Sequence, residues 1–320
     1  MSTDRPPFLP DPAVAARRAA AEASVGGPLV ARIAALAAER DGPDAGDAGV
    51  LLASEATDLV AAFDLAGIED LMCLAIPHAG SLARPAISQF VVGAVGLEAG
   101  SGNLLLGGNV EFPGASLGLT LHGEGAVTLR AFGRGTAIET LAVIRARPCA
   151  HCRQVLTELA WADDLVLIDP AGHRVALDDL YPWPFSPGAL GTTGAVPGAV
   201  PWPDLALASD AAPPPVVERL VRAGSRAHTP YTRSPAAAVL ALPDGRLVAG
   251  SALESVAYNP SIGPVQAAVP ELLARGWELA DVRVAWIAVP AEAPVDHAAG
   301  AHQLLRAVAP AAPVTVVHWS

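Results

Sequence analysis

The sequence predicts an α/β protein, a three-layer αβα sandwich in which helices cover both faces of a mixed sheet. From residue 67 onward, short apolar runs bounded by glycine, proline or serine alternate with stretches of helical periodicity, as when strands alternate with helices. The same order recurs after residue 215, which indicates an internal duplication. Before residue 67, Ala, Leu, Glu and Arg dominate at helical spacing, which predicts a helical extension.

The composition favours a well-folded protein with a large core. The chain has 320 residues, 52% of them hydrophobic, enough to bury one large or two ordinary cores. No uninterrupted apolar run approaches the roughly 18 to 20 residues of a membrane-spanning helix, and the first residues have no apolar stretch of the signal-peptide type. We therefore expect a cytoplasmic protein with no membrane partner.

Charge and cysteine count argue against two further classes. A formal net charge of -12 opposes a sequence-independent grip on a phosphate backbone, so no nucleic acid partner is expected. The cysteines are Cys73, Cys149 and Cys152. Such a small, odd number argues against a disulfide framework and for a reducing compartment.

The first half contains the elements of one sheet covered by helices. Residues 67–80 are expected to be a helix, and the apolar runs 89–97 and 102–110 suit the two strands of a hairpin. A helix, a strand, a helix and a strand are then expected, in that order, at 122–132, 140–146, 150–161 and 164–169.

The rest of the chain divides into a linker and a second half. Prolines and glycines crowd the region between the halves, which is typical of a linker. A helix, a hairpin, a helix and a strand then repeat the earlier order without any cysteine, at 216–224, 236–254, 265–276 and 282–290. The predicted domains are a helical N-terminal extension (1–66), a catalytic half (67–190), a linker (191–215) and a degenerate half without metal ligands (216–320).

Cys149 and Cys152 lie three residues apart behind Pro148, at the start of a predicted helix. This spacing alone fits a redox pair, half of a structural zinc site, part of a catalytic metal site, or coincidence. A water-activating zinc site needs three protein ligands and an open position, whereas a structural site uses four. The remaining histidines and carboxylates must therefore distinguish these possibilities.

His122 and Glu124, at the start of an earlier predicted helix, complete such a set. With Pro148, Cys149 and Cys152 they match the signature H-x-E followed by P-C-x-x-C, which is known from zinc-dependent deaminases. His122 and two thiolates are expected to hold Zn²⁺, because the first turn of a helix favours thiolate over thiol. Glu124 is expected to be the catalytic proton carrier. A redox role for the cysteines would leave the histidine and the glutamate without a purpose.

Other residues near the motif have separate expected roles. Arg153 is expected to donate a hydrogen bond to one of the two sulfurs. His151 lies between the cysteines and is expected to point outward. Cys73 is expected to be a buried, small hydrophobic side chain.

The segments GGNVEFPG, LHGEG and RPCAHCRQVLTEL resemble those of the cytidine deaminases, and the two-half chain resembles the homodimeric bacterial type of that family. The resemblance runs from about residue 68 to the end. It implies the duplicated cytidine deaminase fold, one Zn²⁺ per subunit and a homodimer. It also implies that Asn109 and Glu111 bind the ribose hydroxyls and that Phe90 lies against the pyrimidine. Gly123 is expected to offer its backbone to the substrate.

The activity that this resemblance implies is zinc-dependent hydrolytic deamination of cytidine and deoxycytidine in pyrimidine salvage. Gly125 and Arg147 depart from the residues usual in the family, which leaves open a deaminase of a modified cytosine nucleoside or nucleotide. The alternative from a different class is a catalytically silent zinc-binding scaffold. The presence of Glu124 argues against that alternative.

Overall fold

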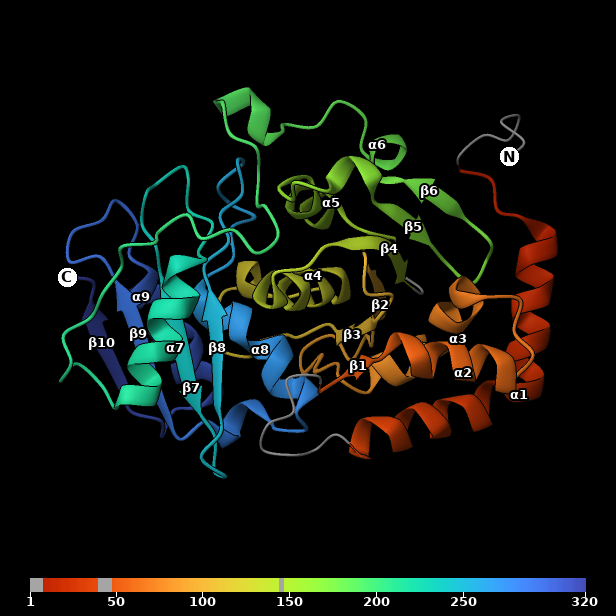
Figure 1. The fold of residues 1–320 in the computed structure, drawn as a ribbon, viewed down its shortest axis with the longest axis horizontal. Helices are drawn as coiled ribbons and strands as arrows, with labels where there is room; N and C mark the ends of the chain where they lie inside the picture. Colours follow the sequence, from red (N-terminus) through yellow and green to blue (C-terminus); the bar gives the residue numbers. More distant parts are fainter. Residues whose placement is uncertain (1–7, 40–47, 144–146) are drawn as a thin grey trace.

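The computed structural model describes residues 8–39, 48–143 and 147–320. Within these residues the chain forms two sheets with helices on their faces (Figure 1), which confirms the predicted α/β class. The N-terminal helices and the first sheet lie at one end of the molecule, and the second sheet lies at the other end.

The first half has its elements in the predicted order, and each predicted helix and strand overlaps an observed one. Residues 144–146 of one predicted strand lie outside the described residues. Strand β6 and helix α6 were not predicted. The bounds are α3 (Ile68–Gly80), β2 (Gly93–Glu98), β3 (Leu104–Gly108), η1 (Leu117–Leu119), α4 (Gly123–Arg134), β4 (Ile138–Val143), α5 (Ala150–Thr157), η2 (Ala162–Asp164), β5 (Val166–Ile168), β6 (Arg174–Ala176), α6 (Leu177–Leu180) and η3 (Pro187–Leu190).

The first sheet is mixed, as predicted. Its strand order is β1-β3-β2-β4-β5-β6. Strands β4 and β5 are parallel, and the other neighbours are antiparallel. Strand β1 (Val50–Leu51) comes from the segment predicted to be a helical extension and pairs with β3. A two-residue strand has no periodicity to reveal it in the sequence.

Successive side chains of β2 pack against helices on opposite faces of this sheet. Val95 and Leu97 pack in a core cluster with α3 and with helix α1 (Pro12–Glu39), whereas Ala94 packs in the cluster that contains α4 and α5. Successive side chains of a strand point to opposite faces of the sheet. The first half is therefore a three-layer αβα sandwich.

Helices α1 and α2 (Ala53–Ala62) form the N-terminal helical extension. Arg17 and Arg18 of α1 form ion pairs with the buried carboxylate of Asp70 in α3. Burial alone raises the pKa of Asp70, but the hydrogen bonds from the two guanidinium groups hold it below its usual range. This ion cluster fixes α1 to the outer face of α3.

Residues Pro12–Ala37 of α1 are, among the described residues, long and apolar enough by composition to cross a membrane. The sequence criterion of an uninterrupted apolar run missed this stretch. One such helix is weak evidence for a membrane span, because length and composition alone decide the test, and 17% of this stretch is buried inside the structure. Here α1 packs against α3.

The second half repeats the first with fewer strands. Helix α9 and strand β10 were not predicted, and the other elements overlap their predicted ranges. The strand order is β10-β9-β7-β8. The bounds are α7 (Pro214–Ser225), β7 (Ala237–Ala241), β8 (Leu247–Ser251), α8 (Pro264–Ala274), η4 (Leu279–Asp281), β9 (Val284–Val289), α9 (His297–Val308) and β10 (Val314–His318).

The pairing pattern confirms the internal duplication. Strands β7, β8, β9 and β10 have the same neighbours and the same directions as β2, β3, β4 and β5. Helix α4 has His122 as its N-cap, and the corresponding helix α8 has Gly263. The second residue after the cap is Glu124 in α4 and Val265 in α8. The second half therefore lacks both the ligand and the carboxylate at this position.

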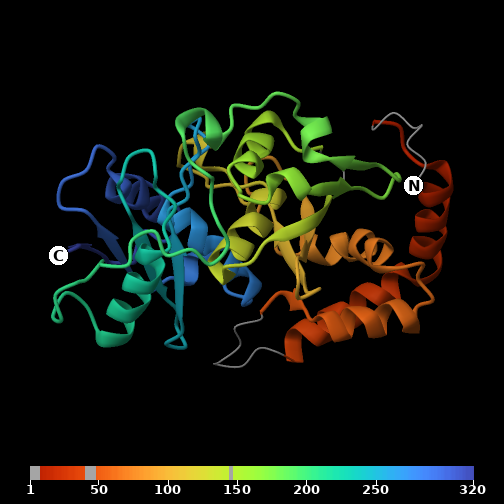
Figure 2. The same cartoon turned by 45° about the horizontal axis from the view of Figure 1, so that its top comes forward.

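The two halves share one hydrophobic core. Helices α4 and α8 lie side by side at the centre of the molecule (Figures 1 and 2) and contact each other. Val127 of α4 and Val269 of α8 belong to the same cluster of buried residues, which also reaches both sheets. Packing of one half is thus coupled to packing of the other.

A buried carboxylate also joins the halves, and no pattern in the sequence indicates it. Glu158, at the end of α5, is fully buried. It accepts hydrogen bonds from His228 Nε2 at 2.7 Å, the Tyr231 hydroxyl at 2.6 Å and the Val256 N–H at 2.7 Å. All three donors belong to the second half. The helix that carries Cys152 is therefore held from the second half. The predicted domain boundaries at 66, 190 and 215 stay a proposal.

We predict that Glu158→Ala lowers the free energy of unfolding by about 3 kcal/mol or more, because it leaves the buried donors of His228 and Val256 without an acceptor and removes the carboxylate partner of the half-buried Tyr231 hydroxyl. Urea denaturation followed by circular dichroism measures the change. Asp164→Ala, at an exposed position of η2, is the control and should stay within about 0.5 kcal/mol of the wild type. Equal stability of the two variants would contradict the role of Glu158.

Candidate active site

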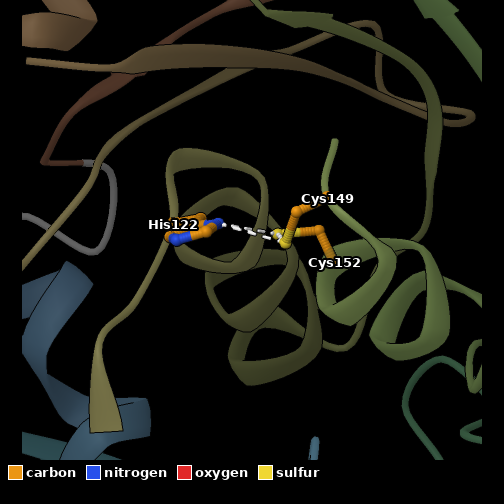
Figure 3. Close-up of side chains that lie close together, drawn as sticks. All are labelled: His122, Cys149 and Cys152. Atoms are coloured by element: carbon orange, nitrogen blue, oxygen red, sulfur yellow. Dashed lines mark hydrogen bonds between the residues drawn. The ribbon is translucent and has the colours of Figure 1, made fainter. Parts of the chain in front are cut away.

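Two helix N-termini bring the motif residues together (Figure 3). His122 is the N-cap of α4, and Cys149 is the N-cap of α5 with Cys152 in its first turn. The Leu121 backbone pairs with Val110, which follows β3. The sheet thus positions the start of α4, and residues about 27 apart in sequence meet at one point, with Cys149 Sγ 3.6 Å from His122 Nδ1.

The three candidate ligand atoms fit one tetrahedral ion. The Cys149 and Cys152 sulfurs are 3.7 Å apart, and His122 Nδ1 lies 3.2 Å from the Cys152 sulfur. Ordinary zinc bond lengths in a tetrahedron require about 3.8 Å between two sulfurs and about 3.6 Å between sulfur and nitrogen. In the described part of the chain this cluster has no fourth His, Cys, Asp or Glu ligand. The donor set therefore fits zinc with one open position.

The sulfur pair favours thiolate. The hydrogen bond between the two sulfurs lowers the pKa of Cys149 to about 4, and it raises the pKa of Cys152 above its usual range. Unpaired N–H groups of the first turn of α5 also favour negative charge at Cys149. The pair is poised to bind a divalent cation and to release its remaining proton when it does so.

Glu124 lies in the first turn of α4 and is 3% exposed. Burial raises its pKa, and the Cys152 side chain is a hydrogen-bond partner that opposes this rise. Its carboxylate is therefore beside the sulfur cluster but outside the ligand set. This position suits a group that exchanges a proton with a molecule held at the open position.

Arg153 does not occupy its predicted place. Its guanidinium donates hydrogen bonds to the carbonyls of Pro148 at 2.8 Å and Leu180 at 2.9 Å, not to a sulfur, so the predicted donation is wrong. Backbone carbonyls near the side chain satisfy its donors, and the bond to Pro148 fixes the turn that precedes Cys149. His151 is exposed, as predicted. Cys73 is buried, also as predicted, and burial raises its pKa to about 12.

The predicted sugar-binding residues hold the loop before β2. The Asn109 amide accepts a hydrogen bond from the Val92 N–H at 2.9 Å and donates one to the Phe90 carbonyl at 2.8 Å. Glu111 accepts hydrogen bonds from the backbone N–H groups of Ile87 and Ser88, both at 2.7 Å. Partial burial alone raises the pKa of Glu111, but these bonds bring it below its usual value.

Phe90 and Ser88 belong to the loop that Asn109 and Glu111 hold. The Phe90 ring is 46% exposed, so it is available to a planar ligand. Ser88, whose hydroxyl donates to Glu111, was missed by the sequence reasoning. The signal that could have found it is the duplication, because Thr232 has the same relation to Glu254 in the second half.

The space around Gly123, Gly125 and Arg147, three further positions near the motif, differs. A Cβ on Gly123 would lie 3.2 Å from Ala94 Cβ and 3.3 Å from the Val92 carbonyl, so glycine lets α4 approach β2 closely. A Cβ on Gly125 would meet nothing within 4 Å. Arg147 is exposed and directly precedes the buried Pro148.

Comparison with known proteins identifies the family. Residues 67–168 and 203–302 each match the family described as cytidine and deoxycytidylate deaminase zinc-binding region. The chain is 32% identical to the cytidine deaminase of Vibrio atlanticus, over 77% of this chain and 82% of that protein. The chain belongs to the cytidine deaminase family.

Other members of this family give similar figures. Identity to the cytidine deaminase of Shewanella baltica is 34%, over 73% of this chain and 77% of the relative. The crystal structure of cytidine deaminase from Mycobacterium tuberculosis is 31% identical, covers 35% of this chain and 91% of that one, and has a TM-score of 0.30. The family description and the His122, Cys149 and Cys152 cluster together support a zinc site.

We predict that Cys149→Ala reduces bound zinc from about one ion per chain to near zero, because two donors cannot hold a tetrahedral ion tightly. Mass spectrometry of the metal content after dialysis against a weak chelator measures this. Cys73→Ala removes a thiol outside the cluster and should keep its zinc. Full zinc content in the Cys149 variant would exclude that residue as a ligand.

Proposed function

We propose that this protein catalyses hydrolytic deamination of cytidine and deoxycytidine to uridine and deoxyuridine with release of ammonia. The observation that carries the proposal is the His122, Cys149 and Cys152 cluster, of zinc-binding geometry, with a buried carboxylate beside it. Relatives that are named cytidine deaminase at 32% and 34% identity support the substrate class.

In the proposed reaction, Glu124 carries out the proton transfers. Activation of water at neutral pH is the chemistry that zinc supplies in such a site. Glu124 takes one proton from the water and delivers it to N3 of the pyrimidine as the water oxygen bonds to C4. It then takes the remaining proton of that oxygen and delivers it to the amine, which leaves as ammonia as the C4–N bond breaks. Burial at 3% exposure keeps bulk water from competing for that proton.

The sugar and the base are assigned to the loop before β2. We propose that Asn109 and Glu111 bind the ribose hydroxyls. Their hydrogen bonds to the loop do not use every lone pair and N–H group of the two side chains, and the remaining ones can bind the sugar. The half-exposed Phe90 ring offers a flat apolar face to the pyrimidine. Gly123 places its backbone N–H at the start of α4, where no side chain separates it from a ligand.

The second candidate is deamination of a modified cytosine nucleoside or nucleotide. Two observations favour it: the open space beside Gly125 and the exposed guanidinium of Arg147 ahead of the cysteines. Turnover compared on cytidine, deoxycytidine, cytidine monophosphate and 5-substituted cytidines distinguishes the candidates. Stoichiometric zinc without turnover of any of these would instead indicate a silent scaffold.

We further propose a cytoplasmic homodimer that acts in pyrimidine salvage. Large apolar side chains are exposed on the loop before β2 and on the loop after α6, which α5 contacts through the Phe185 carbonyl. They include Ile87, Phe90, Val91, Trp183 and Phe185. Several large apolar side chains exposed on two loops in this way support an interface with a second chain.

We predict that light scattering coupled to size exclusion gives a mass of two chains, and that Trp183→Glu shifts the protein toward the monomer, because a charge replaces a side chain that is 99% exposed in one chain. Glu292→Gln alters the charge on another loop of the surface and should leave the mass unchanged. A fully active wild-type monomer would contradict the proposed dimer.

We predict that Glu124→Gln lowers turnover of cytidine by at least about 10²-fold while zinc stays bound, because the amide keeps the shape of the side chain but cannot carry the proton. Loss of ultraviolet absorbance on deamination measures the rate. Glu139→Gln, at an exposed site on β4, is the control and should behave as the wild type. Full activity of the Glu124 variant would remove that residue from the proposed role.

A further inference from the structure

A groove with a cavity volume of about 630 Å³ lies far from the candidate active site. It is lined by the last turns of α4, by one side of α7 along most of its length, by β8 and by α8. Helix α4 begins at the sulfur cluster and ends here after 12 residues, which correspond to about 18 Å at the rise of an α-helix. The groove therefore lies at the opposite end of the helix from Glu124.

Positive charge converges on this groove in a chain whose net charge is -12. Its lining contains the carboxylates of Glu218 and Glu271. The lining also contains six guanidinium groups, one of which, Arg134, pairs with the Glu98 carboxylate next to the lining, so three positive charges remain in surplus. The six guanidinium groups belong to Arg130, Arg134, Arg219, Arg222, Arg226 and Arg275.

The carboxylates nearby neutralise only part of this charge. Arg134 pairs with Glu98, and Arg130 and Arg275 share the single carboxylate of Glu271. Within the described residues, Arg219 and Arg222 of α7 form no ion pair, although Glu218 is adjacent.

A buried, unsatisfied donor lies among these groups. The Arg130 side chain is 1% exposed. Its terminal nitrogens donate to the carbonyls of Ala48, Gly49 and Leu106, but its Nε has no hydrogen-bond partner. Burial lowers the pKa of Arg130, and Arg134 and Arg275 lower it further by repulsion. In the same way, burial and the neighbouring Arg222 lower the pKa of Arg226. The cluster thus holds more positive than negative charge.

Helix capping explains part of this arrangement but not all of it. Cationic side chains stabilise the C-terminal ends of helices, and Arg134, Arg222 and Arg275 lie at such ends. Arg219 lies one turn earlier in α7 and faces the same groove. Capping of three separate helices also gives no reason for their guanidinium groups to converge around one cavity.

We propose that this groove binds a small molecule that carries two or more phosphate groups. Guanidinium groups bind phosphate through paired, charge-assisted hydrogen bonds. One phosphate monoester carries about -1.5 to -2 charges at pH 7, so one group is too few to balance a surplus of three and two groups are needed. The cavity volume is within the range of small-molecule sites, roughly 300 to 1,000 Å³.

Titration calorimetry on the full chain in about 0.1 M salt tests the proposal with two probes, inorganic tripolyphosphate and ATP. We expect binding by the wild type and binding at least about tenfold weaker in the double variant Arg219→Gln with Arg222→Gln, since each lost charge-assisted bond is costly. Both side chains are exposed and unpaired, so the fold should persist, and thermal unfolding without ligand checks this. Arg283→Gln, also exposed but outside the lining, should bind as the wild type does.

The two probes separate the possible sources of the phosphate. Equal binding of tripolyphosphate and ATP means that the groove recognises polyphosphate alone, and tighter binding of ATP means that it also recognises a nucleoside; either supports the proposal. Absence of binding, equal weakening in the Arg283 variant, or binding of an oligonucleotide but not of tripolyphosphate would overturn it. Because binding is measured without turnover, the result is independent of the proposed deaminase activity.

Discussion

Helices α4 and α8 pack against each other and join two sheets into one core. In each half, a glycine in a strand lets the helix lie close to the sheet. A Cβ on Gly107 of β3 would lie 3.0 Å from the Val127 nitrogen of α4, and a Cβ on Gly250 of β8 would lie 2.2 Å from the Pro264 carbonyl of α8. Each helix therefore lies directly on its own sheet while its other side faces the partner helix. The start of α4, and with it the metal cluster, is positioned by this central pair.

The comparison of the halves separates what the fold needs from what the chemistry needs. Glu111 and Glu254 hold their loops through the same pattern of backbone and hydroxyl donors. The first half contains the metal cluster and the second does not, so this pattern serves the fold. At the start of α8, the Gln266 side chain accepts from the Gly263 N–H and donates to the Leu119 carbonyl of the first half. The start of α4 contributes His122 to the candidate metal site, whereas the start of α8 contributes a contact between the two halves.

The sequence predicted the fold class, the duplication and the meeting of the motif residues, because each rests on local patterns. Periodicity reveals β2 and α4, and a known spacing links His122 to the cysteines. It could not predict interactions whose partners are distant in the chain. Glu158 looks like an ordinary helical glutamate until His228 and Tyr231 are placed beside it. Arg153 was predicted to donate to a sulfur, but only the folded chain brings the Leu180 carbonyl, at the end of α6, close enough to accept from it instead.

Comparison of the two halves also indicates which residue of the segment before α4 is specialised for binding a ligand. Glu111 has a counterpart in Glu254, so its carboxylate would be present with or without a substrate. Asn109 corresponds instead to Ala252, whose backbone N–H bonds to the Ala236 carbonyl and whose side chain makes no polar contact. The Asn109 amide both accepts from Val92 and donates to the Phe90 carbonyl. These two hydrogen bonds satisfy the buried amide, and at this position Asn109 is a polar side chain that the first half has and the second half lacks. It connects the rim of the site to the aromatic ring that lies against the base in our proposal.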